Sequence, residues 1–261
     1  MKSRVFRVLL AAVAAFAALL PNLASAMPID KTLNISVYQL CDDAGSNCAA
    51  KGPAENDYFA DATNKIWAQA GISVTFSFVQ KISSSAFLDI SDTLGDNFDT
   101  LHAAYGTHGP SNTSVDMFLV RDYGNGSAYG AGWFGQGGLI MSMQSIMSFN
   151  GGLGRIDTLA HELGHNFGLV STTDPVSNGD GHSSINNQLM APGGTRNVPT
   201  TLADINPDGL GLDRLSPFQI DLARQSGLLS PIPEPKSYAM MLAGLGLMGL
   251  MAGRRQKRRT A

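Results

Sequence analysis

Two histidines with a glutamate between them are spaced for metal chemistry in the segment His161-Glu162-Leu163-Gly164-His165. On an α-helix, residues four positions apart lie on one face, so both imidazoles can bind the same metal ion. Zinc accepts neutral imidazole nitrogen, and a catalytic zinc site keeps one position open for water. The metal lowers the pKa of that water, and Glu162 can take its proton as the water attacks a peptide carbonyl. The spacing therefore indicates a zinc hydrolase with Glu162 as general base. Two surface histidines beside a solvated glutamate are the alternative.

The residues that follow the second histidine extend this pattern. His161 to Gly168 matches HExxHxxG, the opening of the signature HExxHxxGxxH. This stretch resembles the metzincin family of zinc metalloproteases, and especially its matrix-metalloprotease and reprolysin-like members. A glycine at position 168 lets the backbone turn sharply at the helix end, so that a third ligand can return to the metal. The signature has its third histidine three residues after the glycine, where this chain has Ser171, a poor zinc ligand.

Residues 181–192 contain the best candidate for the third ligand. They resemble the matrix-metalloprotease segment that runs from the third ligand into the Met-turn, which implies that His182 binds zinc. The alignment requires an insertion at about residues 171–181, whose composition is typical of turns. Met190 would then be the Met-turn residue that packs under the metal-bound histidines, or else an ordinary core methionine. Asp174 is the alternative third ligand, because some metzincins use aspartate, and His182 would then be a surface-loop histidine.

Hydrophobic periodicity places the motif in a mixed α/β domain. We expect strands at 34–40, 72–79, 115–120 and 139–142, helices at 57–70, 155–169 and 216–227, and mostly irregular chain at 83–107 and 170–214. This order predicts a mixed sheet with one helix placed centrally against it. The family resemblance covers about residues 32–228. It implies an α/β (α+β) zincin fold with a twisted, mostly parallel sheet, a central active-site helix and a helix after the Met-turn. We expect residues 139–142 to be an edge strand that pairs with an extended peptide substrate.

The N-terminal 26 residues are typical of a secretory signal peptide. Lys2, Arg4 and Arg7 precede an apolar run, and the small residues 24–26 form a cleavage pattern. We expect cleavage after Ala26. An uncleaved membrane anchor is the alternative, although the apolar run is short for a membrane span.

The C-terminus, residues 231–261, carries a second sorting signal. A stiff Pro-Ile-Pro-Glu-Pro stretch is followed by an uncharged apolar segment at 237–253 and an arginine-rich end. This trio resembles the PEP-CTERM sorting signal of Gram-negative bacteria, whose transmembrane segment an exosortase is thought to remove after export. The resemblance implies that export machinery and an exosortase-like enzyme handle the chain, which is transiently anchored in the inner membrane. The product would be located at the cell surface or in the extracellular matrix. A permanent single-helix anchor is the alternative.

Residues 27–230 suit one catalytic domain with its own core. The chain has a formal net charge of -3, and the domain has no basic patch, so nucleic acid is not an expected partner. Cys41 and Cys48 bracket a short polar loop, and in an oxidising compartment we expect them to form a structural disulfide.

Two weaker signals have simpler interpretations. Residues 204–209 begin like a calcium loop, with oxygen ligands at alternate positions, but the expected glutamate at the twelfth position is Leu215, so a plain turn is favoured over a Ca²⁺ site. His102 and His108 have the chemistry for a second metal, although loop histidines without such a role fit the sequence better.

The sequence therefore favours an exported zinc-dependent endopeptidase that cleaves peptide or protein substrates and that we expect to be a monomer. The displaced third ligand suggests an alternative, a surface or matrix protein with a metzincin fold and weak or no catalysis. The intact Glu162 argues against it, because a binding module has no need of that carboxylate. A zinc hydrolase that acts on something other than peptide is a third interpretation.

Overall fold

The structure is a computed structural model that describes residues 26–53, 57–91, 96–106, 113–169, 175–179, 181–232 and 245. The chain divides into two compact units, Met1–Ser230 and Pro231–Ala261. The expected signal peptide up to residue 25 and nearly all of the apolar tail segment at 237–253 lie outside the described residues. Within the described ranges, no helix combines the length and the apolar character needed to cross a membrane.

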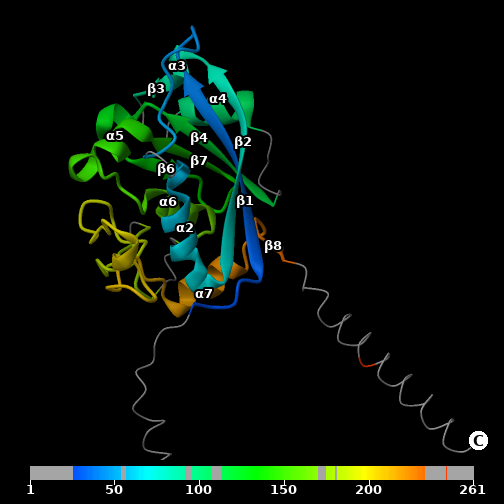
Figure 1. The fold of residues 1–261 in the computed structure, drawn as a ribbon, viewed down its shortest axis with the longest axis vertical. Coiled ribbons are helices and arrows are strands. Elements are labelled where there is room, and N and C mark those ends of the chain that lie inside the picture. Colours follow the sequence, from blue (N-terminus) through cyan, green and yellow to red (C-terminus); the bar gives the residue numbers. More distant parts are fainter. Residues whose placement is uncertain are drawn as a thin grey trace, which may run out of the picture. The chain divides into compact units, whose positions relative to one another are not determined.

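A twisted, mostly parallel sheet forms the centre of the first unit (Figure 1). Five of its strands run in the order β2-β1-β4-β7-β6, in which β6 is antiparallel to β7 and the other neighbours are parallel, and a short strand, β8 (Ser230–Pro231), also pairs with β1. The bounds are β1 (Lys31–Cys41), β2 (Ile72–Ser83), β4 (Ser114–Val120), β6 (Gly130–Gly132) and β7 (Gly138–Ser142). The predicted mixed, mostly parallel sheet is confirmed.

The strand at this edge of the sheet is β6, and not the strand at residues 139–142 that the sequence suggested. Residues 139–142 belong to β7, which lies between β4 and β6 and is buried along its whole length. The prediction of an edge strand there was therefore wrong. The continuous apolar run of β7 is typical of a strand that is covered on both faces. The strand at the edge, β6, has the sequence Gly-Ala-Gly, which has no pattern typical of a strand.

One face of the sheet is covered by the helix that bears the histidine motif, α6 (Thr158–Asn166), together with α2 (Ala60–Trp67), as Figure 1 shows. Short 3-10 turns, η1 (Asp57–Phe59) and η2 (Ala68–Ala70), flank α2. The Trp67 and Phe167 rings meet edge to face, with their centroids 4.7 Å apart. This packing joins α2 to the C-terminal end of the motif helix.

A helix that the sequence did not predict, α4 (Asp96–Tyr105), contacts β4. Phe98 and Leu101 are buried at helical spacing, and the His102 Nε2 atom lies 3.3 Å from a carboxylate oxygen of Asp116 in β4. The expectation of irregular chain from 83 to 107 was therefore wrong for α4, whose few apolar residues give only a narrow periodic stripe. The same region holds α3 (Ser85–Leu88) and β3 (Asp89–Ile90), which pairs with β5 (Asp122–Tyr123).

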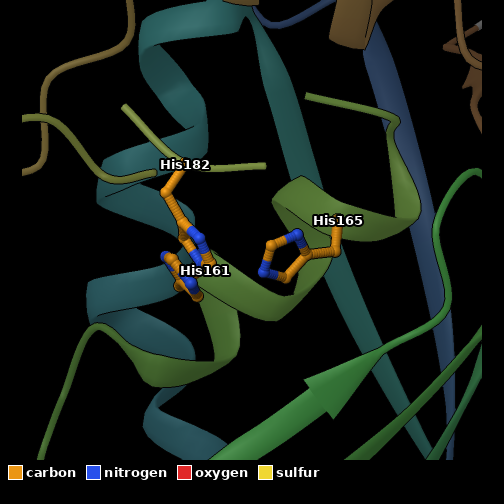
Figure 2. A group of neighbouring side chains, drawn as sticks. All are labelled: His161, His165 and His182. Carbon is orange, nitrogen blue, oxygen red and sulfur yellow. The ribbon is translucent and has the colours of Figure 1, made fainter. Parts of the chain in front are cut away.

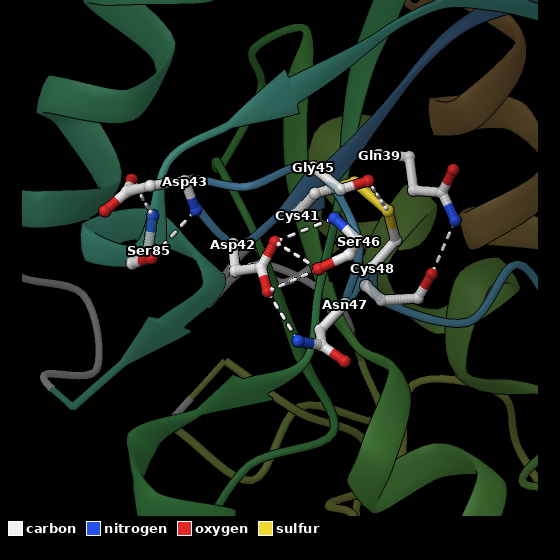
Figure 3. Close-up of a disulfide and its surroundings, with 10 residues drawn as sticks. Gln39, Cys41, Asp42, Asp43, Gly45, Ser46, Asn47, Cys48 and Ser85 are labelled. Carbon is white, nitrogen blue, oxygen red and sulfur yellow. Dashed lines mark hydrogen bonds between the residues drawn. A yellow bond between two sulfur atoms is a disulfide. The ribbon is translucent and has the colours of Figure 1, made fainter.

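The predicted disulfide between Cys41 and Cys48 is present at the end of β1 (Figure 3). It closes a loop in which the Asp42 carboxylate accepts a hydrogen bond from the Ser46 N–H at 2.8 Å. This bond and others from the same loop lower the pKa of Asp42 to about 2. The loop is therefore held by both a covalent and a polar crosslink.

The remaining elements surround the motif helix. They are η3 (Gly124–Gly126), α5 (Met143–Ser148), η4 (Phe149–Gly152), η5 (Leu202–Asp204), α7 (Pro217–Arg224) and β8 (Ser230–Pro231). The closing helix α7 lies within the range 216–227 expected for a last helix, with Pro217 at its first position and Ser216 as its N-cap. A reciprocal pair of bonds between Ser216 and Gln219 satisfies the N–H groups of its first turn.

Candidate metal centre

The motif helix is shorter than predicted. The sequence indicated a helix over 155–169, whereas α6 spans Thr158–Asn166 and the chain then turns at Gly168, whose φ of 80° is left-handed. Glycine adopts this conformation without steric cost, as the sequence analysis anticipated. The helix presents His161, Glu162 and His165 towards one cavity.

Three histidine side chains converge at this point (Figure 2). The candidate ligand nitrogens of His161, His165 and His182 all lie within 4.8 Å of one another. The His161 ring centroid is 4.9 Å from that of His165 and 5.5 Å from that of His182. The structure therefore brings together all three histidines that the sequence singled out, although His182 is seventeen positions from His165 in the chain. Among the described residues, no other group of metal-binding side chains gathers in this way.

The backbone around His182 is held by hydrogen bonds from its own segment. The Asn178 N–H donates to the carbonyl of His182 at 2.8 Å, and the His182 N–H donates to Asn178 Oδ1 at 3.2 Å. The next residue, Ser183, donates its N–H to the carbonyl of Met190 at 2.7 Å. These bonds tie the third histidine to the turn that contains Met190.

That turn also contacts the motif helix. The Nδ1 atom of His161 lies 2.7 Å from the carbonyl oxygen of Leu189. A carbonyl can only accept, so this contact is a hydrogen bond in the tautomer that carries its proton on Nδ1, and in that tautomer the lone pair of Nε2 is available for a metal. Met190 is fully buried, and a Cβ added to Gly164 would lie 2.2 Å from its Sδ atom. The absence of a side chain at Gly164 is what lets Met190 pack directly against the helix at this position.

The donor set suits zinc, which is bound by neutral imidazole. Burial, followed by the charge of Arg196, lowers the pKa of His161 well below its usual value. Burial, followed by His182 and then Arg196, lowers the pKa of His165 to about 4. Both rings are therefore uncharged at neutral pH, with nitrogen lone pairs free to bind a cation.

Glu162 is buried beside the histidines, and this burial raises its pKa to about 7. The charges of Arg196 and Arg155 and a hydrogen bond from the Gly132 N–H oppose the rise. A carboxyl group with a pKa near neutrality can accept and release protons at physiological pH. This property is suited to general acid–base chemistry.

The edge strand β6 lies directly against this part of the helix. A Cβ added to Gly132 would lie 2.5 Å from the carbonyl oxygen of Glu162, and one added to Gly130 would lie 3.0 Å from the Glu162 Cγ atom. Only glycine permits so close an approach. The sheet edge that could pair with an extended chain therefore passes next to the buried glutamate.

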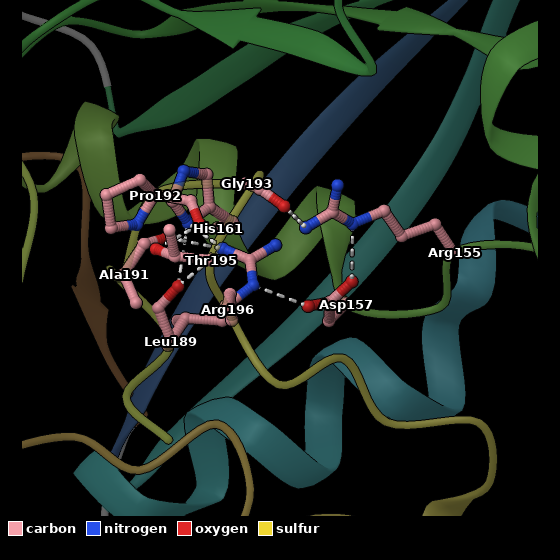
Figure 4. Close-up of polar contacts among 9 residues, drawn as sticks. All are labelled: Arg155, Asp157, His161, Leu189, Ala191, Pro192, Gly193, Thr195 and Arg196. Carbon is pink, nitrogen blue, oxygen red and sulfur yellow. Dashed lines mark hydrogen bonds and ion pairs between the residues drawn. The ribbon is translucent and has the colours of Figure 1, made fainter. Parts of the chain in front are cut away.

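A buried charged cluster that the sequence did not indicate lies beside His161 (Figure 4). The Nε atom of Arg196 is 2.8 Å from one carboxylate oxygen of Asp157, and the Nε atom of Arg155 is 3.5 Å from the other. Arg196 also contacts His161 and donates its Nη1–H to the carbonyl of Leu189 at 2.6 Å. The nearby carboxyl of Asp213 is buried and has no hydrogen-bond partner among the described residues, and burial raises its pKa well above its usual value.

A cavity of about 960 Å³ opens over the three histidines and Glu162. Its walls come from β6, from the aromatic residues of the segments on either side, and from the arginine cluster. The lining residues include Tyr129, Gly130, Gly132, Trp133, Phe149, Arg155, Thr158, Gly193 and Arg196. Its volume is large enough to admit a substrate segment rather than a water molecule alone.

The other candidates from the sequence have different outcomes. Asp174 and His108 lie outside the described residues. His102 packs between Asp116 and the Trp133 ring. In the suggested calcium loop, the Asp204 carboxylate instead accepts N–H groups from residues 200 and 201, and Asp208 pairs with Lys65 at 2.7 Å. Calcium binding therefore has no support there, and the turn interpretation is favoured.

Parts of the chain match known proteins. Residues 231–259 match the PEP-CTERM protein-sorting motif. A comparison with curated protein sequences gave no match. Solved structures that match include archaemetzincin from Methanopyrus kandleri, at 13% identity and a TM-score of 0.39, covering 80% of this chain and 98% of that one. Metalloproteinase-II from Bacteroides fragilis matches at 15% identity and a TM-score of 0.41, covering 78% of this chain and 54% of that one.

A family model of zinc-dependent metallopeptidases also matches residues 74–210, and it is described as metallo-peptidase family M12B, reprolysin-like. This span covers more than half of the chain and includes all three clustered histidines and Glu162. The predicted resemblance to reprolysin-like metalloproteases is thereby confirmed, and the chain belongs to the reprolysin-like M12B metallopeptidases.

Proposed function

We propose that this chain is an exported zinc endopeptidase in which His161, His165 and His182 bind the metal and Glu162 is the general base. The observation that supports this most directly is the convergence of three imidazole nitrogens within 4.8 Å, next to a buried carboxyl group. Zinc held there would supply Lewis-acid chemistry, which acidifies water and polarises a carbonyl group.

The side chains of the protein would divide the remaining work. Glu162 takes the proton of the attacking water and passes it to the nitrogen that leaves as an amine. The Leu189 carbonyl orients the His161 ring, and Met190 supports the helix from below. The free edge of β6 offers backbone groups to an extended peptide, which places its scissile carbonyl near Glu162. A peptide is favoured over a small-molecule substrate because a sheet edge lies beside the site.

The ends of the chain fit the same proposal. Residues 1–26 would be a cleaved signal peptide, residues 27–230 the catalytic domain, and residues 231–261 a tail that anchors the chain transiently in the inner membrane. The PEP-CTERM match in this tail supports processing by an exosortase-like enzyme. The proposed destination is the cell surface or extracellular matrix of a Gram-negative bacterium.

Substitution of Glu162→Gln tests the proposed mechanism. The variant should keep about one zinc per chain, because Glu162 is not a ligand, and should lose peptide cleavage by a factor of about 10² to 10⁴, the usual contribution of a general base. Asp61→Asn, at an exposed position in α2, is the matched control and should cleave normally. Peptide cleavage that survives Glu162→Gln would contradict the mechanism. A wild-type chain that binds zinc but cleaves no peptide would favour the non-catalytic surface protein.

A further inference from the structure

Arg155 occupies an unusual place in the wall of the cavity. Its guanidinium carbon lies 4.4 Å from the centroid of the Tyr129 ring and 5.6 Å from that of Phe149, so two aromatic faces hold it. Its Nη2 atom donates to the carbonyl of Gly193 at 3.2 Å. The side chain is only 3% exposed. Arg155 is therefore fixed in position rather than free to extend into solvent.

Two hydrogen-bond donors in this wall have no partner of their own. The Nη1 atom of Arg155 makes no hydrogen bond to any described residue, and Figure 4 draws it pointing away from Asp157. The Thr158 hydroxyl is buried and also has no partner within the described part of the chain. Both residues line the cavity that contains Glu162. A buried donor without an acceptor is unfavourable, so a ligand that supplied an acceptor to the Thr158 hydroxyl would bind more tightly.

The charge of this wall favours an anion. Arg155 and Arg196 share the single carboxylate of Asp157, which is 2.8 Å from Arg196 and 3.5 Å from Arg155. The nearby Asp213 carboxyl is buried, and burial, which disfavours its negative charge, raises its pKa well above the usual value. Glu162 lies at the histidine end of the cavity. One guanidinium charge in the wall is therefore not balanced by a carboxylate of its own, and Arg155 is the more weakly paired of the two.

We propose that Arg155 and Thr158 form a subsite that binds the acidic side chain of a substrate residue next to the scissile bond. This inference rests on the proposed endopeptidase function and adds a substrate class to it. The Tyr129 and Phe149 rings pack on the aliphatic part of that side chain, while its carboxylate accepts hydrogen bonds from Arg155 Nη1 and from the Thr158 hydroxyl. An uncharged aliphatic side chain would fill the same space and leave both donors unpaired.

Matched peptides test this subsite. Two series differ at one residue only, with aspartate against asparagine and glutamate against glutamine, because each pair has nearly the same shape and differs in charge. The zinc-loaded wild-type chain should cleave the acidic member with a kcat/KM about 10 to 100 times higher, the range expected from one charge-assisted hydrogen-bond pair. Equal kcat/KM values for acid and amide at every position of the peptide would overturn the proposal.

Two variants assign the preference to these residues. Arg155→Met removes the charge and leaves Asp157 paired with Arg196, and Thr158→Val removes only the hydroxyl. Each should lower the acid-to-amide ratio towards one while the amide peptide is still cleaved. Arg121→Met is the matched control, because Arg121 forms an exposed ion pair with Asp89 and does not line the cavity. Its ratio should stay at the wild-type value. A ratio unchanged in Thr158→Val and Arg155→Met would overturn the assignment.

Binding measured without cleavage separates this proposal from the proposed function. Calorimetric titration of the zinc-loaded Glu162→Gln chain with the same peptides should give about tenfold tighter binding for the acidic member. Acid-selective binding in a protein whose wild type cleaves nothing would support the subsite and contradict the endopeptidase. Cleavage by the wild type, combined with equal binding of the acidic and amide peptides, would support the endopeptidase and contradict the subsite.

Discussion

The Nδ1 atom of His161 lies 2.7 Å from the carbonyl oxygen of Leu189, the residue immediately before the buried Met190. This contact joins the motif helix to the turn that follows His182, so two segments separated by more than twenty residues form one unit. The orientation of the first histidine and the position of the third thus depend on the same short stretch of backbone. The consequences of this arrangement can be measured in several ways.

The first prediction concerns the third ligand. Zinc content of the purified chain should be about one per molecule in wild type and in Asp174→Ala. In His182→Ala, the zinc affinity should fall by more than about 100-fold, since even loss of a group that only orients a ligand costs 10- to 100-fold. Metal analysis after equilibrium with a competing chelator measures this. Loss of zinc from Asp174→Ala, with zinc retained in His182→Ala, would identify Asp174 as the third ligand.

The second prediction concerns the close approach of β6 to the helix. Gly132→Ala should lower the free energy of unfolding by about 1–3 kcal/mol, because its Cβ would lie 2.5 Å from the Glu162 carbonyl oxygen and force the strand away. Peptide cleavage should fall as well. Gly227→Ala is the matched control, since an added Cβ there meets nothing within 4 Å. The free energy of unfolding in denaturant and kcat/KM are measured for both variants. Equal values for Gly132→Ala and Gly227→Ala would contradict the predicted steric clash.

A third prediction concerns the contact between Gly164 and Met190. Gly164→Ala should destabilise the chain by about 1–3 kcal/mol, because its Cβ would clash with the Met190 Sδ atom. Met190→Ala alone should cost about 2–5 kcal/mol through the cavity that it leaves. In the double variant the new methyl group fills part of that cavity, so the combined loss should be smaller than the sum by about 0.5–3 kcal/mol. Strict additivity in denaturant unfolding would show that the two residues do not interact.

The fourth prediction concerns pH and the unpaired carboxyl of Asp213. Its pKa is raised in the folded chain, so the folded state holds this proton more tightly than the unfolded state, and stability is lost as pH rises above about 4. Asp213→Asn removes the charge and keeps a residue type that tolerates the left-handed φ of 52°. At pH 7 the variant should be more stable than wild type by about 1–3 kcal/mol, the cost of an unpaired buried group.

Denaturant unfolding at several pH values tests this fourth prediction. The advantage of Asp213→Asn should shrink as the pH falls towards 4, where the carboxyl group is protonated in both states. Asp61→Asn, at an exposed position, should show no such trend. If the stability advantage of Asp213→Asn instead grew as the pH fell, the pKa of Asp213 would be lowered by folding and the prediction would be wrong.

The parts of the fold that the sequence revealed are those with strong local patterns. The apolar run of β4 and the HExxH spacing in α6 depend on neighbours along the chain, so the sequence displays them directly. The helix α4 was missed because Phe98 and Leu101 are its only fully buried apolar residues. The edge strand was misplaced because Gly-Ala-Gly has no intrinsic preference for a strand. Only its position against Glu162 explains that sequence.

The site shows the same division. His161, Glu162 and His165 could be found from spacing alone, and His182 was found through family resemblance. The buried pairing of Asp157 with Arg155 and Arg196 could not be found in this way, because Arg196 is far from Asp157 in the sequence and no periodic pattern links the two. Burial is the information that was lacking, since an arginine in the sequence usually indicates an exposed surface.

The hydrogen bonds of Asn178 and Ser183 hold the backbone of His182 in a loop, outside any regular helix or strand. The third histidine is therefore placed by a part of the chain that is separate from the motif helix. Substitutions at residues 178 or 183 can for this reason displace His182 while the spacing of His161 and His165, which the helix sets, stays the same.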